Sequence, residues 1–205
     1  MSDNVFRNND LFFEMDSISQ QYQFGLEAVR EAYRTLSNYY LEDFATDSNL
    51  CVIYFTSHSF YGTNDESQAR ETLFESNRFE WRNTTVRTAA RNIFLRDVYK
   101  QWYLSGISST YNTCKRVYGL LEELTAGYRV ITVGGSAGGY AALQFGCALG
   151  AEAIFAFSPQ FNLLLDLVTP EDFLKNPLVV EAKSRGVTSL LDVTGPLELR
   201  GLPTI

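Results

Sequence analysis

The chain has 205 residues, 45% of them hydrophobic and 20% charged, a composition typical of one folded globular domain. A formal net charge of −7, with no basic stripe, argues against nucleic-acid binding, because phosphates would be repelled. No apolar run approaches the ~18 residues of a membrane span. Residues 1–10 lack the basic start and apolar core of a secretory signal.

The three cysteines, Cys51, Cys114 and Cys147, each lie inside an apolar segment. Such positions predict buried, reduced thiols in a reducing compartment, so we expect a cytoplasmic protein. None of the three has a second cysteine or a histidine at the close spacing that zinc ligands require. We therefore expect neither a metal site nor a cofactor.

The first predicted element is an amphipathic helix over residues 24–40, where apolar residues recur every three or four positions. A continuous apolar run over residues 50–55 predicts a strand that is buried on both faces. Residues 56–70 are expected to form a loop. Residues 71–82 are expected to form a short helix or an irregular segment.

Residues 92–95 are the second predicted strand. A helix capped by Ser108 or Ser109 is expected to follow it and to stop at Gly127. The chain then alternates between strand and helix, with a strand at 128–133, a helix at 140–149 and a strand at 153–157.

Strands that alternate with helices predict an α/β fold: a mostly parallel sheet, in three layers, with helices on both faces. We expect residues 1–205 to form a single domain. Residues 160–200 are less regular, and they form either a cap over the active face or a segment packed against the sheet edge.

The motif Gly-x-Ser-x-Gly stands between the third strand and the helix that follows it, with Ser136 at its centre. A strand that turns sharply into a helix at a serine is the sequence form of a nucleophile elbow. Side chains two residues before and after the serine would collide there, so the geometry requires glycine at Gly134 and Gly138. The first N–H groups of the helix favour an anion, and the N–H of Ala137 is a candidate oxyanion donor.

Two phosphate-binding motifs are weaker interpretations of the same residues. A Walker A loop has lysine after its second spaced glycine, but Tyr140 follows Gly139 here. A dinucleotide-binding fingerprint requires glycine at the position of Ser136.

The run from residue 134 to 146, followed by Phe-Ala-Phe-Ser-Pro-Gln at 155–160, resembles the α/β-hydrolase superfamily. It is similar in particular to a bacterial group of serine esterase or acyltransferase type, with a GGSAGGYAAL elbow and a strand that ends in FSPQ. Residues 92–97 and 101–103 also resemble this group, so the similarity covers residues 50–160. Some members occur among genes for surface polysaccharides, which implies a glycan or a small ester as substrate.

The chain departs from that family after Ser136, because family triads continue with an acid and then a histidine, and no histidine follows here. Residues 201–205 look like the start of another strand, so we expect the C-terminal strands to be missing. Loss of triad members typically lowers the rate by ~10⁴–10⁶-fold. The exposed edge of an incomplete sheet would favour homo-oligomers or aggregation.

The sequence's single histidine, His58, follows the first predicted strand. The resemblance implies that this loop supplies the second oxyanion donor, through the backbone N–H of Ser57 or His58. For the imidazole itself two interpretations remain, a general base and a solvated loop residue.

Asp166 is either the catalytic acid or an exposed, helix-capping residue. Asp97 is expected to be structural or to face the substrate, paired with its neighbour Arg96. Three aromatic residues are candidates either for a substrate pocket or for the core: Trp81, Trp102 and Tyr103.

Two functions are consistent with this pattern. The first is a serine hydrolase of the carboxylesterase or acyltransferase type, which forms an acyl-enzyme on Ser136 and acts on an acylated glycan or a small ester. The second is a catalytically impaired protein that keeps the fold and has a binding or regulatory role. Neither involves nucleic acid or a membrane.

Overall fold

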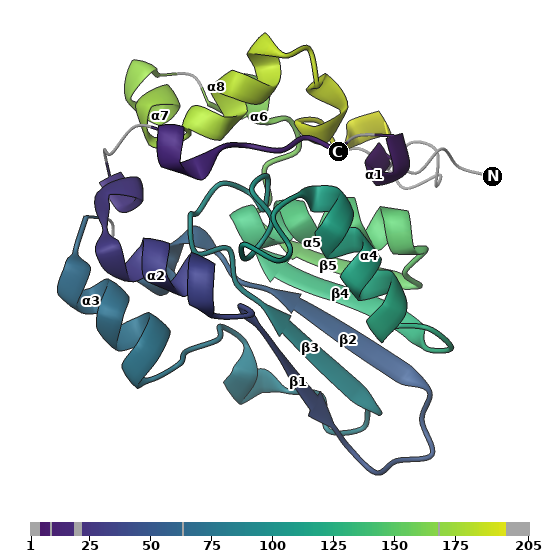
Figure 1. Ribbon diagram of the computed structural model, residues 1–205. Coiled ribbons are helices and arrows are strands. Elements are labelled where there is room, and N and C mark those ends of the chain that lie inside the picture. Colours follow the sequence, from purple (N-terminus) through teal and green to yellow (C-terminus); the bar gives the residue numbers. More distant parts are fainter. Residues whose placement is uncertain (1–4, 9, 19–21, 63, 168, 196–205) are drawn as a thin grey trace.

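The computed structural model describes residues 5–8, 10–18, 22–62, 64–167 and 169–195. Its sheet has five strands in the order β1-β3-β2-β4-β5 (Figure 1). The strands are β1 (Tyr39–Asp43), β2 (Leu50–Phe55), β3 (Arg91–Leu95), β4 (Arg129–Gly135) and β5 (Ala153–Phe157). All neighbours run parallel except β1, which is antiparallel to β3. The predicted α/β class and the mostly parallel sheet are confirmed.

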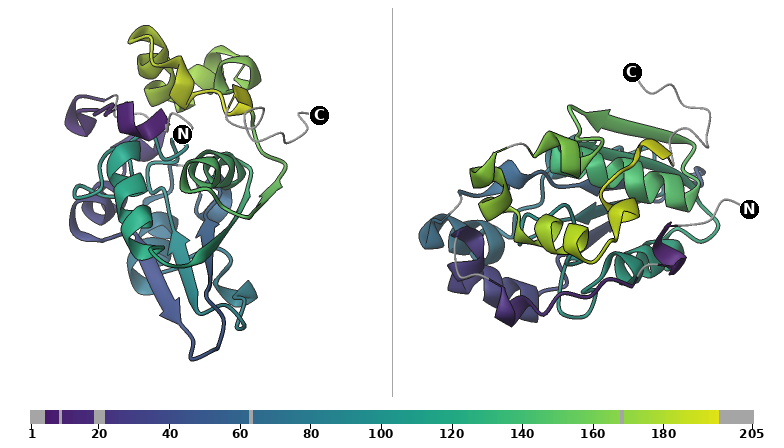
Figure 2. Two further views of the ribbon diagram at one scale, coloured as in Figure 1. Left: turned by 90° about the vertical axis from the view of Figure 1, so that its right-hand side faces the viewer. Right: turned by 90° about the horizontal axis from the view of Figure 1, so that it is seen from above.

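The helices are α1 (Val5–Asn8), α2 (Glu27–Thr35), α3 (Glu66–Arg70), α4 (Cys114–Leu124), α5 (Ala137–Leu149), α6 (Leu163–Asp166), α7 (Pro170–Lys175) and α8 (Pro177–Ser184). Helix α5 packs directly on β2, β4 and β5, and α4 packs beside α5. The three last helices form a separate layer, with the N-terminal segment alongside them (Figures 1 and 2).

Strand β2 shows how the sheet is covered on both faces, because its side chains alternate between them. Phe55 points into the main core, where its ring stacks on Phe145 of α5 at 5.5 Å. Tyr54 points to the other face and stacks on Phe94 at 4.7 Å. Phe79 and Ala89, from the connection between α3 and β3, bury this second face.

The residues expected to form one helix, 24–40, instead contain the helix α2 and the start of the strand β1. Asn38 separates them: its φ of 57° is left-handed, and its buried amide donates hydrogen bonds to the carbonyls of Ala32 and Ile107. The tight turn lets the chain enter the sheet as an outer strand. The expected helix at 24–40 is therefore too long, and β1 was not foreseen.

Two helix starts also differ from the expectation. Helix α4 is capped by Thr113, whose Oγ1 accepts from the N–H of Arg116 at 3.1 Å, whereas Ser108 accepts from Tyr111 in an earlier turn. Helix α5 begins at Ala137, three residues before the expected start, directly after the serine. The expected loop over 56–70 includes α3 at its end.

The segment 160–200 was expected to be less regular, either as a cap or packed against the sheet edge; its described part forms the short helices α6, α7 and α8. Two hydrogen bonds attach this segment: Tyr140 of α5 donates to the Leu190 carbonyl at 2.6 Å, and Gln101 donates to the Lys175 carbonyl at 3.0 Å. A role as a cap stays a prediction. The strand expected at 201–205 lies outside the described residues.

Strand β5 is an outer strand, and Phe155 and Phe157 on it are 51% and 54% exposed. The self-association expected at a sheet edge stays a prediction. In the described part of the chain, no helix is long and apolar enough to cross a membrane. The same part contains no group of three or more His, Cys, Asp or Glu residues that could hold a metal ion. The three cysteines are free thiols, two of them buried.

Candidate active site

Ser136 occupies a strained turn between β4 and α5, with φ 51° and ψ −121°. Its side chain is exposed. The turn is held from two sides, because the N–H of Ser136 donates to the carbonyl of Phe157 at 2.9 Å and its carbonyl accepts from the N–H of Tyr140 at 3.0 Å. A non-glycine residue persists in such a conformation only when its surroundings impose it. We call residues 134–139 the serine turn.

The glycines of the serine turn are required by close backbone approaches. A Cβ on Gly134 would lie 2.1 Å from the carbonyl oxygen of Gly138, and a Cβ on Gly138 would lie 2.2 Å from the carbonyl oxygen of Phe55. Real Cβ atoms do not come so near to backbone. The collision expected two residues on either side of the serine is therefore confirmed. Glycine at these positions lets the start of α5 lie directly against the end of β2.

Ala137 opens the first turn of α5, where N–H groups have no acceptor within the helix. The helix has 13 residues, so its N-terminus carries a partial positive charge beside the serine. The geometry is suited to stabilising negative charge on an oxygen close to the serine Oγ.

The loop after β2 binds a carboxylate that the sequence did not reveal. Ser57 donates to Glu80 twice, from its N–H to Oε2 at 2.5 Å and from its Oγ to Oε1 at 3.0 Å. Of the two N–H groups expected to be the second oxyanion donor, that of Ser57 is thus occupied by a carboxylate oxygen, and the role of the His58 N–H stays a prediction. Glu80 lies 23 residues from Ser57, in the region expected to be helical or irregular, and no motif marks it.

His58 begins a 3₁₀ turn after β2 and packs edge-on against Trp102, with ring centroids 4.5 Å apart. Its Nε2 accepts a long hydrogen bond, 3.5 Å, from the N–H of Trp102. Burial, with a smaller contribution from the charge of Lys100, lowers the pKa of His58 to about 3. Within the described residues, no hydrogen bond joins the imidazole to Ser136. The neutral ring of His58 instead packs against Trp102 in the loop after β3.

The loop after β3 is organised by Asp97, which is buried. Its carboxylate accepts from the N–H groups of Tyr99, Gln101 and Tyr103 at 3.2, 2.6 and 2.8 Å. Burial raises the pKa of Asp97 to about 6, and these hydrogen bonds limit the rise. Asp97 therefore shapes the loop from inside.

The expected pairing of Asp97 with Arg96 does not occur. The buried guanidinium of Arg96 instead donates to Asn38 Oδ1 at 2.9 Å and to the carbonyls of Arg78 and Leu73 at 3.0 and 3.2 Å. The two neighbours diverge because successive residues at the end of a strand point to opposite faces. Arg96 holds the connection between α3 and β3 against the sheet.

Two tryptophans lie at the same end of the sheet as the serine turn. The indole N–H of Trp81 donates to the Phe55 carbonyl at 3.3 Å, and its ring stacks on Phe157 at 5.8 Å. The indole N–H of Trp102 donates to Gln160 Oε1 at 3.2 Å.

The third aromatic candidate has a different setting. Tyr103 is buried in the core, and its hydroxyl donates to the Thr56 carbonyl at 3.1 Å. Of the three aromatic candidates, the two tryptophans border the loops around Ser136.

Asp166, the candidate acid, has a local role. Its carboxylate accepts from the N–H groups of Phe161 and Asn162 at 3.0 and 3.2 Å, which closes the turn before α6. This contact matches the capping interpretation of the residue.

Comparisons with known proteins concern the fold. No protein-family model matches the chain, and no curated protein matches it by sequence. Among solved structures, the chain is similar to a capsule O-acetyltransferase of Neisseria meningitidis serogroup A, solved in complex with caged gadolinium. The TM-score is 0.50 at 11% sequence identity. The match covers 79% of this chain and only 65% of the transferase chain, so this chain spans less than two thirds of it.

These findings contradict the family predicted from the sequence. No family model supports membership of the α/β-hydrolase superfamily, and the sheet is mixed, with β1 antiparallel to β3. The likeness that the comparisons do support is one of fold, to the capsule O-acetyltransferase. The short run around Ser136 predicted the local turn correctly, but such a run is not enough to assign a family.

Proposed function

We propose that this protein carries out acyl transfer or ester hydrolysis, with Ser136 as the nucleophile. The observation that carries the proposal is the serine turn: an exposed serine, in strained geometry, at the N-terminus of a 13-residue helix. Strained strand-to-helix turns of this kind present a serine Oγ to an incoming carbonyl carbon. The fold likeness to a capsule O-acetyltransferase supports an acyl group, and a glycan or a small ester, as the substrate class.

In the proposed reaction, the Ser136 Oγ forms a bond to the acyl carbonyl carbon while its proton leaves. The carbonyl oxygen becomes negative and accepts hydrogen bonds from the Ala137 N–H and from the backbone N–H of His58 or of Ser57, the latter only after it has released Glu80. Collapse breaks the bond to the leaving alcohol, which takes up a proton. The acyl group then passes to water or to a glycan hydroxyl, and the serine regains its proton.

We do not assign the removal of the serine proton to His58. Its Nε2 lone pair faces the Trp102 N–H, and its lowered pKa makes the ring a weak base. The roles proposed for the described residues are those of nucleophile and oxyanion donor. Without an imidazole base the reaction at Ser136 is expected to be slow, and to accelerate with pH as hydroxide removes the proton.

The test is labelling of the full chain by a fluorophosphonate, with the modified residue located by mass spectrometry. We expect covalent modification of Ser136 that increases between pH 7 and pH 9 and is lost in Ser136→Ala. Ser158→Ala is the matched control, because Ser158 is also exposed, follows the neighbouring strand and has a positive φ of 46°. Equal labelling of wild type and Ser136→Ala would refute the proposal.

A further inference from the structure

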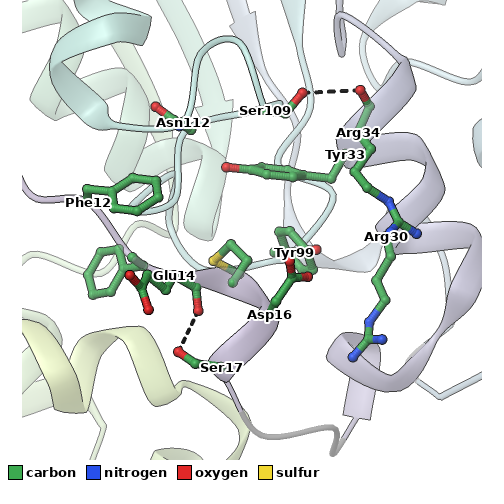
Figure 3. A pocket seen from close by; sticks show the side chains of 12 residues that line it. Phe12, Glu14, Asp16, Ser17, Arg30, Tyr33, Arg34, Tyr99, Ser109 and Asn112 are labelled. Carbon is green, nitrogen blue, oxygen red and sulfur yellow. Dashed lines mark hydrogen bonds between the residues drawn. The ribbon is translucent and has the colours of Figure 1, made fainter.

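A cavity of about 620 Å³ lies away from the serine turn, between the N-terminal segment 12–17, helix α2 and the loop that follows β3 (Figure 3). Its volume is in the range of ~300–1,000 Å³ that is usual for small-molecule sites. No part of the proposed acyl chemistry uses it.

Aromatic rings form part of the wall of the cavity. The rings of Tyr33 and Tyr99 meet at 4.7 Å and are themselves buried, so they present fixed surfaces. Phe12 lies opposite them and is 47% exposed. Arg185 anchors the Phe12 segment, donating to the Phe12 carbonyl at 2.8 Å while its guanidinium lies 5.4 Å from the ring of Phe13. The site is therefore built before any ligand arrives.

Planar polar side chains surround these rings (Figure 3). The Nε of Arg30 is held by the Phe24 carbonyl at 2.8 Å, and its terminal nitrogens have no acceptor among the residues that the structure describes. The carboxylate of Asp16 has no donor in that part of the chain either, and the amide of Asn112 likewise has no partner there. Donors and acceptors are thus both available at the cavity.

Charge narrows the choice of ligand. Two arginines, Arg30 and Arg34, and two carboxylates, Glu14 and Asp16, line the cavity, so their formal charges cancel. Burial raises the pKa of Tyr99 to about 12. The positive charge of Arg30 opposes this rise, and the negative charge of Asp16 adds to it, so both charges act on the Tyr99 hydroxyl. An anion would meet the carboxylates, and a cation would meet the guanidinium groups.

We propose that this cavity binds a neutral carbohydrate segment. Sugar hydroxyls both donate and accept, so they can pair with Arg30, Asp16 and Asn112 at different places around the cavity (Figure 3). The C–H faces of a pyranose ring suit the exposed ring of Phe12 and the edges of Tyr33. The inference does not rest on acyl chemistry at Ser136, because none of these residues belongs to the serine turn.

The experiment is an amide NMR titration of the full chain with neutral trisaccharides of glucose, mannose, galactose and N-acetylglucosamine. We expect at least one of them to cause saturable shifts centred on the amides of Tyr99 and Asn112. Gln and Asn can still form neutral hydrogen bonds, so only the extra strength of a charged partner is lost. Arg30→Gln and Asp16→Asn should therefore each weaken binding by about fivefold.

Matched controls are Arg87→Gln and Asp47→Asn, which remove the same charges at exposed positions elsewhere. Both should leave the affinity unchanged, and so should Ser136→Ala, which separates this site from the proposed reaction. The inference is overturned if no trisaccharide binds saturably, or if Arg30→Gln and Asp16→Asn bind as wild type does. It is also overturned if inorganic phosphate binds there and binds more tightly in Asp16→Asn.

Discussion

Replacing Gly138 by alanine should destabilise the protein, because the added Cβ has no room. It would lie 2.2 Å from the oxygen and 2.8 Å from the carbon of the Phe55 carbonyl, and backbone atoms cannot rotate away as a side chain can. Overpacking of this kind costs about 1–3 kcal/mol and sometimes more, whereas alanine gains about 1 kcal/mol over glycine in a helix interior. Because both contacts are with backbone, the upper end of the overpacking range applies, and the expected net loss in the free energy of unfolding is about 2 kcal/mol or more.

Urea unfolding followed by circular dichroism measures this loss, and Gly119→Ala is the matched control. Gly119 is exposed in the interior of α4, and a Cβ there would meet nothing within 4 Å, so alanine should stabilise by about 0.5–1 kcal/mol. Gly139→Ala, with its nearest contacts at 3.2 Å, should fall between the other two variants. If Gly138→Ala does not fold, a lower stability of Gly139→Ala than of Gly119→Ala still tests the close packing at the start of α5. A Gly138→Ala protein as stable as Gly119→Ala would refute the close approach of β2 and α5.

Two further predictions concern the loop after β2. Glu80→Gln should speed fluorophosphonate labelling of Ser136 about fivefold, because a neutral acceptor binds the Ser57 N–H about 1 kcal/mol more weakly than a carboxylate does. Glu75→Gln, at an exposed position nearby, should not change the rate, and slower labelling in Glu80→Gln would mean that the carboxylate positions the loop rather than blocks it. The imidazole of His58, the only one in the chain, should show no titration between pH 5 and pH 8 by NMR, because its pKa is lowered to about 3. Its unfolded pKa is ~6.5, so its contribution to stability is complete above that pH and is lost as the pH falls towards 3. A midpoint near 6.5 would contradict the burial of the ring.

The elements that the sequence predicted well are those whose signal is local and continuous. The strands at 50–55 and 153–157 have the predicted bounds, because short runs of β-branched and aromatic residues favour strands both inside a sheet, as in β2, and at its edge, as in β5. The turn at Ser136 followed from its glycines for a similar reason, since neighbours in sequence create the crowding. Helix periodicity misled at residues 36–40, where Tyr40 continues the helical spacing of Leu36 but belongs to an outer strand.

The contacts that complete the candidate site could not be predicted, because they join residues far apart in the chain. Glu80 reaches Ser57 across 23 positions, and Gln160 reaches Trp102 across 58. No motif marks Glu80, and the run that ends at Gln160 gives no indication of which residue the Gln160 side chain contacts. The prediction that Arg96 pairs with Asp97 was wrong for a different reason. The two residues are adjacent in sequence, but their side chains point to opposite faces where the strand ends, so the two charges do not meet.

The loop after β3 borders both proposed sites. Asp97 folds it back on itself, and Lys100, Trp102 and Tyr103 adopt positive φ values of 55°, 51° and 63° within it. This conformation turns Tyr99 towards the cavity and brings Trp102 against His58 and Gln160. A buried carboxylate that satisfies three backbone N–H groups is a reason for such a strained loop to hold one shape. The two sites therefore depend on one rigid support, while the side chains that would contact each ligand are different.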